Sequence, residues 1–159
     1  MSEKKRQTCC FTGHRRLPQE EIESIVKRLD ITINGLIGKG VTDFISGGAI
    51  GFDLIAASLI IAKKEMGHKV RLIFALPYRG QDENWSEGQK KLYHDLLGEA
   101  DEIIYVSEES GDGCMKKQGR YMINRSAYCI CALLSPMSGT NQTARYARQK
   151  GLRVINVAD

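Results

Sequence analysis

Short apolar runs alternate along this chain with segments of helical pattern, and this alternation limits the fold more than any other feature. Six runs have the composition of buried strands, at residues 7–12, 41–46, 69–75, 101–106, 128–134 and 152–157. The segments between them, 18–37, 52–66, 84–97, 115–126 and 142–150, have helical patterns. Continuous apolar strands separated by helices predict a mainly parallel sheet covered on both faces. We therefore expect a Rossmann-like three-layer α/β/α sandwich.

Length and composition indicate one ordinary globular domain. The 159 residues suffice for a single core, and we expect residues 1–6 to form a flexible tail. No apolar run approaches the roughly 18 residues of a membrane span, and the first residues lack the apolar core of a secretory signal. We expect a cytoplasmic protein without membrane contact. The net charge of +4 permits an anionic partner without requiring one.

The five cysteines fit a reducing compartment. Most of them lie in apolar runs, where free thiols behave as small buried hydrophobic groups. Zinc sites favour pairs of cysteines with two residues between them, and Cys129 and Cys131 have only one. We predict free thiols and no metal site.

Parallel sheets of this kind bind ligands beyond the carboxyl ends of their strands. Four predicted loops follow strand ends, at residues 12–16, 46–53, 76–79 and 135–142. Leaving aside residues that are evidently solvent-exposed, these four loops contain most of the glycines, hydroxyl side chains and arginines of the chain. We expect these loops to converge on one rim of the sheet.

The loop 46–53 carries the spacing G-G-x-x-G immediately before a predicted helix, with Gly47, Gly48 and Gly51. One interpretation is that free N–H groups at the helix start face a phosphate. The alternative is that the glycines only close a tight turn. A carboxylate at Asp53 would repel a phosphate, so its partner should be a hydroxyl or amino group. We expect Gly48→Val to abolish ligand binding with limited loss of fold.

The other three loops offer further groups, each with an ordinary structural alternative. Near residue 140, a hydroxyl and backbone N–H groups form either a second phosphate cradle or a simple helix cap. Arg15 or Arg16, close to Gly13, could bind phosphate as a fork, or the loop could be a solvated basic turn. Trp85 is either a stacking partner for a base or part of the core.

Four segments resemble one family. They are "CFTGHRR", "ISGGAIGFDLIAA", "LPYRGQDENW" and "SGTNQTARYARQKG", and the similarity runs from about Cys9 to Val157. They resemble the bacterial YpsA-like family of the SLOG superfamily, Rossmann-like proteins named for the Smf/DprA proteins and the LOG-type phosphoribohydrolases. The resemblance implies a pocket for ADP-ribose, NAD or another nucleoside phosphate such as AMP. A similarity to DprA around residues 120–147 adds Asn124 and Arg125 to the rim.

The same resemblance bears on catalysis. LOG-type enzymes carry a glutamate in the motif GG-x-GT-x-x-E, and Thr143 stands at that position here. Threonine cannot serve as a carboxylate acid or base, so we favour binding and assign no catalytic residue. The predicted ligand-binding residues are Thr12, Gly13, His14, Arg15, Gly47, Gly48, Gly51, Asp53, Pro77, Tyr78, Trp85, Asn124, Arg125, Ser138, Gly139 and Thr140.

Three hypotheses for function follow. The first is a nucleotide-binding sensor or regulatory domain. The second is a nucleotide-cleaving enzyme of the phosphoribohydrolase type. The third, a DprA-like binder of single-stranded DNA, is disfavoured because only 7% of residues are aromatic and no long basic run exists. The identity of the ligand and the formation of a homodimer are left open.

Overall fold

The computed structural model describes residues 2–134 and 139–158, and within them six strands form one sheet. All neighbouring strands are parallel, in the order β4-β3-β2-β1-β5-β6. The strands are β1 (Thr8–Gly13), β2 (Asp43–Ser46), β3 (Arg71–Leu76), β4 (Glu102–Tyr105), β5 (Tyr128–Ala132) and β6 (Arg153–Asn156). The predicted parallel sheet is confirmed.

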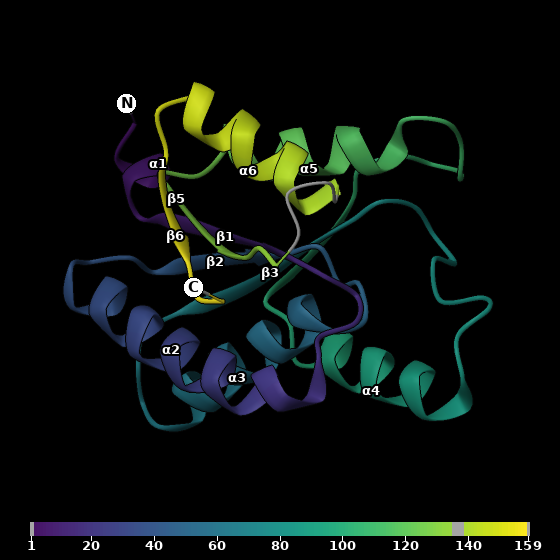
Figure 1. The fold of residues 1–159 in the computed structure, drawn as a ribbon, viewed down its shortest axis with the longest axis horizontal. Coiled ribbons are helices and arrows are strands. Elements are labelled where there is room, and N and C mark those ends of the chain that lie inside the picture. Colours follow the sequence, from purple (N-terminus) through teal and green to yellow (C-terminus); the bar gives the residue numbers. More distant parts are fainter. Residues whose placement is uncertain (1, 135–138, 159) are drawn as a thin grey trace.

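The helices cover both faces of this sheet. They are α1 (Glu3–Arg6), α2 (Gln19–Gly38), α3 (Phe52–Glu65), α4 (Glu87–Gly98), α5 (Cys114–Asn124) and α6 (Gly139–Gln149). Helices α2, α3 and α4 lie on one face, and α1, α5 and α6 lie on the other (Figure 1). This is the predicted three-layer sandwich. None of the helices in the described residues combines the length and apolarity needed to cross a bilayer.

Helix starts follow their local capping chemistry. Pro18 is the N-cap of α2, so that helix begins one residue later than expected. The predicted helix 84–97 begins at Glu87, because the Ser86 hydroxyl accepts from the Gln89 N–H and the Gln89 side chain accepts from the Ser86 N–H. These small shifts leave the order of elements unchanged.

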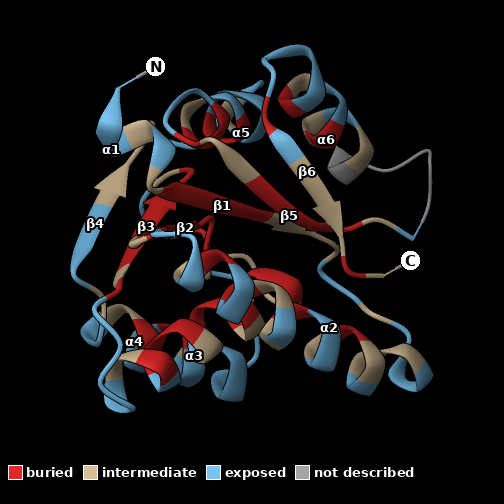
Figure 2. Cartoon of the chain, turned by 90° about the vertical axis from the view of Figure 1, so that its left-hand side faces the viewer, coloured by how far each residue is buried: buried red, intermediate tan, exposed pale blue. Residues whose placement is uncertain are grey.

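The core consists of two apolar layers, one on each side of the strands (Figure 2). On the α2–α3 side, Phe11 stacks on Phe44 with ring centroids 6.0 Å apart and meets Phe52 edge-on. On the α5–α6 side, smaller residues fill the layer, among them Cys10 and Cys129, which are opposite one another in β1 and β5. Within the described residues the five cysteines are thiols outside disulfides, and four of them are buried.

Residues 3–6 of the expected flexible tail form the single-turn helix α1. Ser2 caps the single turn of α1. The ammonium of Lys4 lies 2.7 Å from the buried carboxylate of Asp43, and the hydroxyl of Thr8 donates to the Lys4 carbonyl. These contacts attach α1 to the amino edge of the sheet. The apolar pattern could not reveal them, because they are made by polar groups.

The order of the strands locates the functional edge. From β1 the chain proceeds through β2, β3 and β4 to one side, and then returns to place β5 and β6 on the other side. Sheets of this kind bind ligands beyond the carboxyl ends of the strands, next to the point where the strand order reverses, which is beside β1 here. The loops after β1, β2 and β3 reach this edge, as predicted, whereas residues 135–138 of the fourth predicted loop lie outside the described residues.

Candidate functional site

The turn between β2 and α3 uses several of its own backbone donors. The Gly48 N–H donates to the Ser46 hydroxyl at 3.2 Å, and the Ala49 N–H donates to Asp53 Oδ2 at 3.3 Å. The Phe52 N–H donates to the carbonyl of His14 at 3.1 Å. The expectation that the amides of this loop stand free for an anion is therefore wrong at these three positions. In the described part of the chain, the N–H groups of Ile50 and Gly51 have no acceptor.

The glycines of this turn are required by packing. A Cβ on Gly47 would lie 2.8 Å from Gln118 Nε2 and 2.9 Å from Asp53 Oδ2. Gly48 has a φ of +73°, and a Cβ there would lie 2.6 Å from Leu76. The expectation that Gly48→Val spares the fold is therefore wrong, because the substitution strains the backbone and displaces a core side chain.

Gly51 allows two loops to approach each other. Its φ is +88°, and a Cβ would lie 2.3 Å from the carbonyl oxygen of Arg15 and 2.5 Å from that of His14. The loop after β1 thus lies directly against the start of α3. This contact brings the Arg15 and Arg16 backbone to the helix terminus, where the helix dipole favours negative charge.

Asp53 is buried close to this turn. Its side chain lies in the first turn of α3 and is 9% exposed. Oδ2 accepts from Ala49, whereas Oδ1 is buried without a partner in the described structure. Burial raises the pKa of this carboxyl to about 7, against the opposing effects of the Ala49 N–H and the charge of Arg15. Asp53 can therefore hold or release a proton near neutral pH.

The loop after β1 is joined to Leu134, the last described residue after β5, at the carboxyl edge of the sheet. The Leu134 N–H donates to Nε2 of His14 at 3.0 Å, so that nitrogen carries no proton. His14 is thus a hydrogen-bond acceptor that connects the two loops. Thr12 lies in β1 opposite Cys131, and a Cβ on Gly13 would meet the Phe52 ring at 2.4 Å. The structure gives Gly13 a packing role.

Four of the predicted residues, Arg15, Gly51, Tyr78 and Trp85, line one cavity of about 630 Å³, here called the rim cavity. It opens between the loop after β1, the start of α3 and the loop that leads into α4. Both arginines, Arg15 and Arg16, are exposed. The cavity is lined by Arg15, Arg16, Ile50, Gly51, Leu54, Ile55, Ser58, Tyr78, Gln81, Asn84, Trp85, Gln89 and Leu92.

Gln81 provides a buried polar group in the wall of the rim cavity. The side chain is 6% exposed, and its Nε2 donates to the Tyr93 hydroxyl at 3.0 Å and to the Gly48 carbonyl at 3.4 Å. Because a carbonyl can only accept, the amide nitrogen must face Gly48, and Oε1 must point the other way. Oε1 is buried without a hydrogen-bond partner in the described residues.

The aromatic residues of the rim cavity pack partly against other side chains of the protein. The Trp85 ring packs edge-on against Tyr93, with centroids 5.0 Å apart. Trp85 and Tyr78 are both half-buried, so each keeps some surface toward solvent. Pro77, which precedes Tyr78, is buried, and its carbonyl accepts from the Ser107 N–H.

Asn124 and Arg125 do not join this rim, which corrects their expected position. They end α5 at the opposite edge of the sheet, in a cavity shared with Thr8 and Arg71, near the first residues of β1 and β3. Residues just before a parallel strand lie at its amino end, so their position before β5 already contained this information. Ser138 lies outside the described residues, and for Gly139 and Thr140 only the helical backbone is described.

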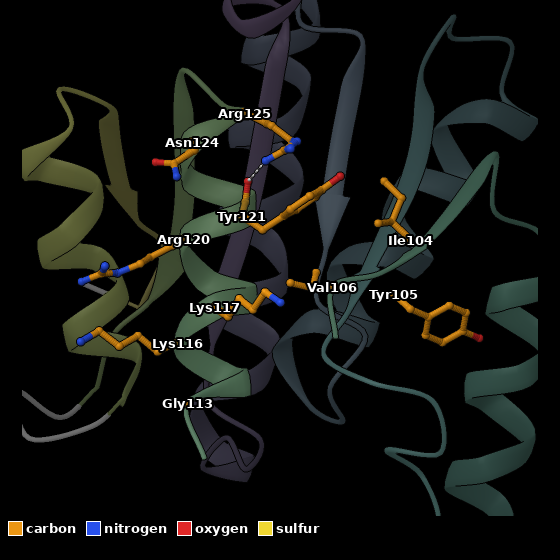
Figure 3. A pocket seen from close by; sticks show the side chains of 10 residues that line it. All are labelled: Ile104, Tyr105, Val106, Gly113, Lys116, Lys117, Arg120, Tyr121, Asn124 and Arg125. Atoms are coloured by element: carbon orange, nitrogen blue, oxygen red, sulfur yellow. Dashed lines mark hydrogen bonds between the residues drawn. The ribbon is translucent and has the colours of Figure 1, made fainter. Parts of the chain in front are cut away.

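A second cavity, here called the α5 cavity, lies between α5 and β4 and has a volume of about 580 Å³. Figure 3 shows Lys117 directed from α5 toward Val106 and Tyr121 extending to the same side of the helix, with Arg125 beside the Tyr121 ring. The guanidinium of Arg125 lies 3.6 Å from the centroid of that ring. Four basic residues and no acidic residue line this cavity.

Sequence reasoning missed two groups at these sites, Gln81 and Gln118. Arg16 and Gln81 line the rim cavity, and Gln118 connects α5 to the turn after β2 by donating to the carbonyls of Gly47 and Ala75. Arg16 stood in the basic loop already singled out. The two glutamines gave no signal, because a buried amide has the same sequence appearance as an exposed one.

Comparison with known proteins agrees with this architecture. The family model YpsA, described as the YspA SLOG family, matches residues 9–152. The "Uncharacterized SPbeta prophage-derived protein YoqJ" of Bacillus subtilis is 35% identical over 119 residues, which cover 67% of this chain and 69% of that protein. A UPF0398 protein of Halalkalibacterium halodurans is 29% identical over 107 residues, 66% of this chain and 57% of the relative.

Solved structures of DNA processing protein A (DprA) share the fold. The protein from Streptococcus pneumoniae superposes with a TM-score of 0.66 at 18% identity, over 94% of this chain and 50% of that one. A structure describing the single-stranded DNA binding mode of the Helicobacter pylori protein gives 0.64 at 19% identity, over 92% and 63%. The chain thus spans about half to two thirds of these DprA chains.

Proposed function

The chain belongs to the YpsA family of SLOG proteins, and from that premise we propose that it is a sensor or regulatory domain that binds a nucleotide-related ligand in the rim cavity. ADP-ribose, NAD and AMP-like nucleoside phosphates are the candidate ligands. The observation that carries the proposal is the meeting, in one cavity, of Arg15 and Arg16, the start of α3 and the half-buried Trp85.

The anionic part of the ligand would lie near the two arginines. Both guanidinium groups are exposed, and among the described residues neither pairs with a carboxylate. Guanidinium groups bind phosphate oxygens as a fork, and the amides of Ile50 and Gly51 add donors at the positive end of α3. A phosphate group would supply the negative charge and the hydrogen-bond acceptors that these arginines and amides can bind.

The remaining wall suits a base or sugar. Tyr78 and Trp85 offer aromatic surface for stacking, which is worth about 1–3 kcal/mol per base in other nucleic-acid sites. The unpartnered Oε1 of Gln81 would accept from an N–H or O–H group of the ligand. A buried acceptor without a partner is unfavourable, so a ligand donor at this position would remove that cost.

The test is calorimetric titration with ADP-ribose, NAD and AMP. We expect at least one to bind, and Arg15→Gln/Arg16→Gln to weaken it by at least about 100-fold, because each of the two charge-assisted contacts contributes roughly 1.5–3 kcal/mol. Arg148→Gln, an exposed arginine of α6, is the matched control and should bind normally. Wild-type affinity in the double variant would contradict the assignment of the cavity.

The ligand can also be identified without prior choice. Mass spectrometry of freshly purified, denatured protein should release a small phosphorylated compound from wild type and less of it from Arg15→Gln/Arg16→Gln. An unphosphorylated compound retained equally by both proteins would argue against a nucleotide site.

One observation favours a second candidate, cleavage of a nucleotide's glycosidic bond. The pKa of Asp53 is raised to about 7 by burial, which is suitable for a general acid or base at neutral pH. Thr143, which stands at the glutamate position of LOG-type enzymes, lies against Gly119 of α5. Released base after incubation with AMP or NAD, lost in Asp53→Asn, would favour this candidate over binding alone.

A further inference from the structure

Charge is divided unevenly along the chain. Between Gly113 and Ala158 there are eight lysines and arginines and no aspartate or glutamate. The 112 residues before them hold 15 basic and 18 acidic residues. The modest net charge of +4 conceals this division, because the acidic first part offsets the basic second part.

The fold gathers these cations into one layer. All eight are exposed, and five lie on two neighbouring helices, Lys116, Lys117 and Arg120 on α5, and Arg145 and Arg148 on α6. Figure 1 shows α5 and α6 side by side on one face of the sheet. A Cβ on Gly119 of α5 would lie 3.3 Å from Thr143 of α6, so the helices pack closely at that point.

The protein does not neutralise this layer. Among the described residues, none of the eight cations forms an ion pair with a carboxylate. In the rest of the molecule, Lys4, Lys63, Lys64, Arg71 and Lys91 each lie within ion-pair distance of one. Exposed cations that form no close ion pair repel one another and attract a polyanion.

Two aromatic rings lie among the cations. Besides Arg125 on Tyr121, the guanidinium of Arg120 lies 4.9 Å from the centroid of the Tyr146 ring, and both tyrosines are half-buried. In Figure 3, Arg120 extends from α5 toward α6, while Tyr121 extends toward β4 in the α5 cavity. The layer therefore combines guanidinium groups with aromatic rings on both sides of α5.

We propose that the α5–α6 layer binds the phosphodiester backbone of a single-stranded nucleic acid. Binders of single strands combine a basic surface with aromatic rings on which bases stack, whereas an acidic protein segment would require only the charge. Five of the eight cations are arginines, whose planar fork matches phosphate oxygens. This surface lies on the opposite face of the sheet from α3 and α4, and hence is separate from the rim cavity (Figure 2).

The decisive measurement is the salt dependence of binding. Fluorescence anisotropy follows a labelled oligothymidylate of about 16 nucleotides, the upper end of single-domain site sizes, across a sodium chloride series. For single strands, the slope of log affinity against log salt is roughly −0.7 per phosphate contacted. We expect Lys117→Gln/Arg145→Gln to weaken binding and to make the slope shallower by about 1.4.

Two controls separate this proposal from the others. Lys27→Gln/Lys39→Gln removes two exposed cations on the α2 side, and it should leave affinity and slope unchanged. Arg15→Gln/Arg16→Gln should bind the oligonucleotide as wild type does, even where it has lost the nucleotide.

Three results would overturn the proposal. They are the absence of salt-sensitive binding in wild type, an unchanged slope in Lys117→Gln/Arg145→Gln, and equal competition by a polyglutamate of the same charge. The last would indicate a surface for acidic protein segments.

Discussion

The backbone N–H of Phe52 donates to the carbonyl of His14 at 3.1 Å, which joins the first residue of α3 to the loop after β1. One donor of the helix terminus is thereby used within the protein. The same contact holds the Arg15–Arg16 loop beside the N–H groups of Ile50 and Gly51, at the wall of the rim cavity.

Gly51→Ala should destabilise the protein by at least about 3 kcal/mol, because it combines a left-handed backbone with a clash against two carbonyls. Gly80→Ala is the matched control, since Gly80 has a φ of +82° and nothing within 4 Å of a Cβ. That control should lose only about 1 kcal/mol. Urea unfolding measures both, and equal losses would show that close approach of the loops is unimportant.

Asp53→Asn should change how stability depends on pH. The folded carboxyl keeps its proton up to about pH 7, whereas in the unfolded chain it loses it near 3.8. The folded state therefore binds more protons in this window, and the wild-type free energy of unfolding falls as pH rises, by at most about 4 kcal/mol.

Asparagine has no proton to lose and keeps an acceptor for the Ala49 N–H. Asp53→Asn should thus gain stability relative to wild type between pH 4 and pH 7 and retain that gain at pH 8. Chemical unfolding at several pH values provides the comparison, with the exposed Asp112→Asn as control. A difference from wild type that does not vary with pH would mean that Asp53 titrates normally.

Gln118→Leu should cost roughly 2–4 kcal/mol, because the carbonyls of Gly47 and Ala75 would lose their shared donor in a buried position. Backbone amides of the turn 46–52 should also exchange faster with solvent. Gln149→Leu, at an exposed position of α6, should change neither property. Unaltered exchange in Gln118→Leu would show that α5 does not support this turn.

Ser86→Ala should lower stability by about 1 kcal/mol through loss of the capping box of α4. Because Gln89 is both a member of this box and part of the rim-cavity wall, the variant should also weaken any ligand bound there. Thermal unfolding and titration measure the two effects. Ser24→Ala within α2 is the control, and it should be neutral or slightly stabilising.

The sequence was sufficient to predict the sheet. Strands such as β3 are apolar at every buried position, and helices such as α2 repeat Ile25, Leu29, Ile33 and Leu36 on one face. Both signals are local, because they arise from the direction of successive side chains along a regular backbone. The boundaries moved by up to three residues where polar groups set the cap, as Ser86 does for α4.

The sequence predicted the site less completely. Arg15, Gly51, Tyr78 and Trp85 came together in the rim cavity, as converging strand ends require. Gly47 and Gly48 instead accommodate Gln118, Asp53 and Leu76. A glycine that admits a ligand and a glycine that admits a neighbouring side chain have the same sequence pattern, so only the packing distinguishes them.

The order of strands and helices, their common carboxyl edge and the count of charges along the chain were all determined by the sequence itself, because each depends on residues close together in the chain. The tertiary structure alone decided which loop amides were already bonded, where Asp53 and Gln81 became buried, and that the cations of α5 and α6 share one surface. These properties depend on distances between segments far apart in the chain, and such distances exist only after the helices have packed on the sheet.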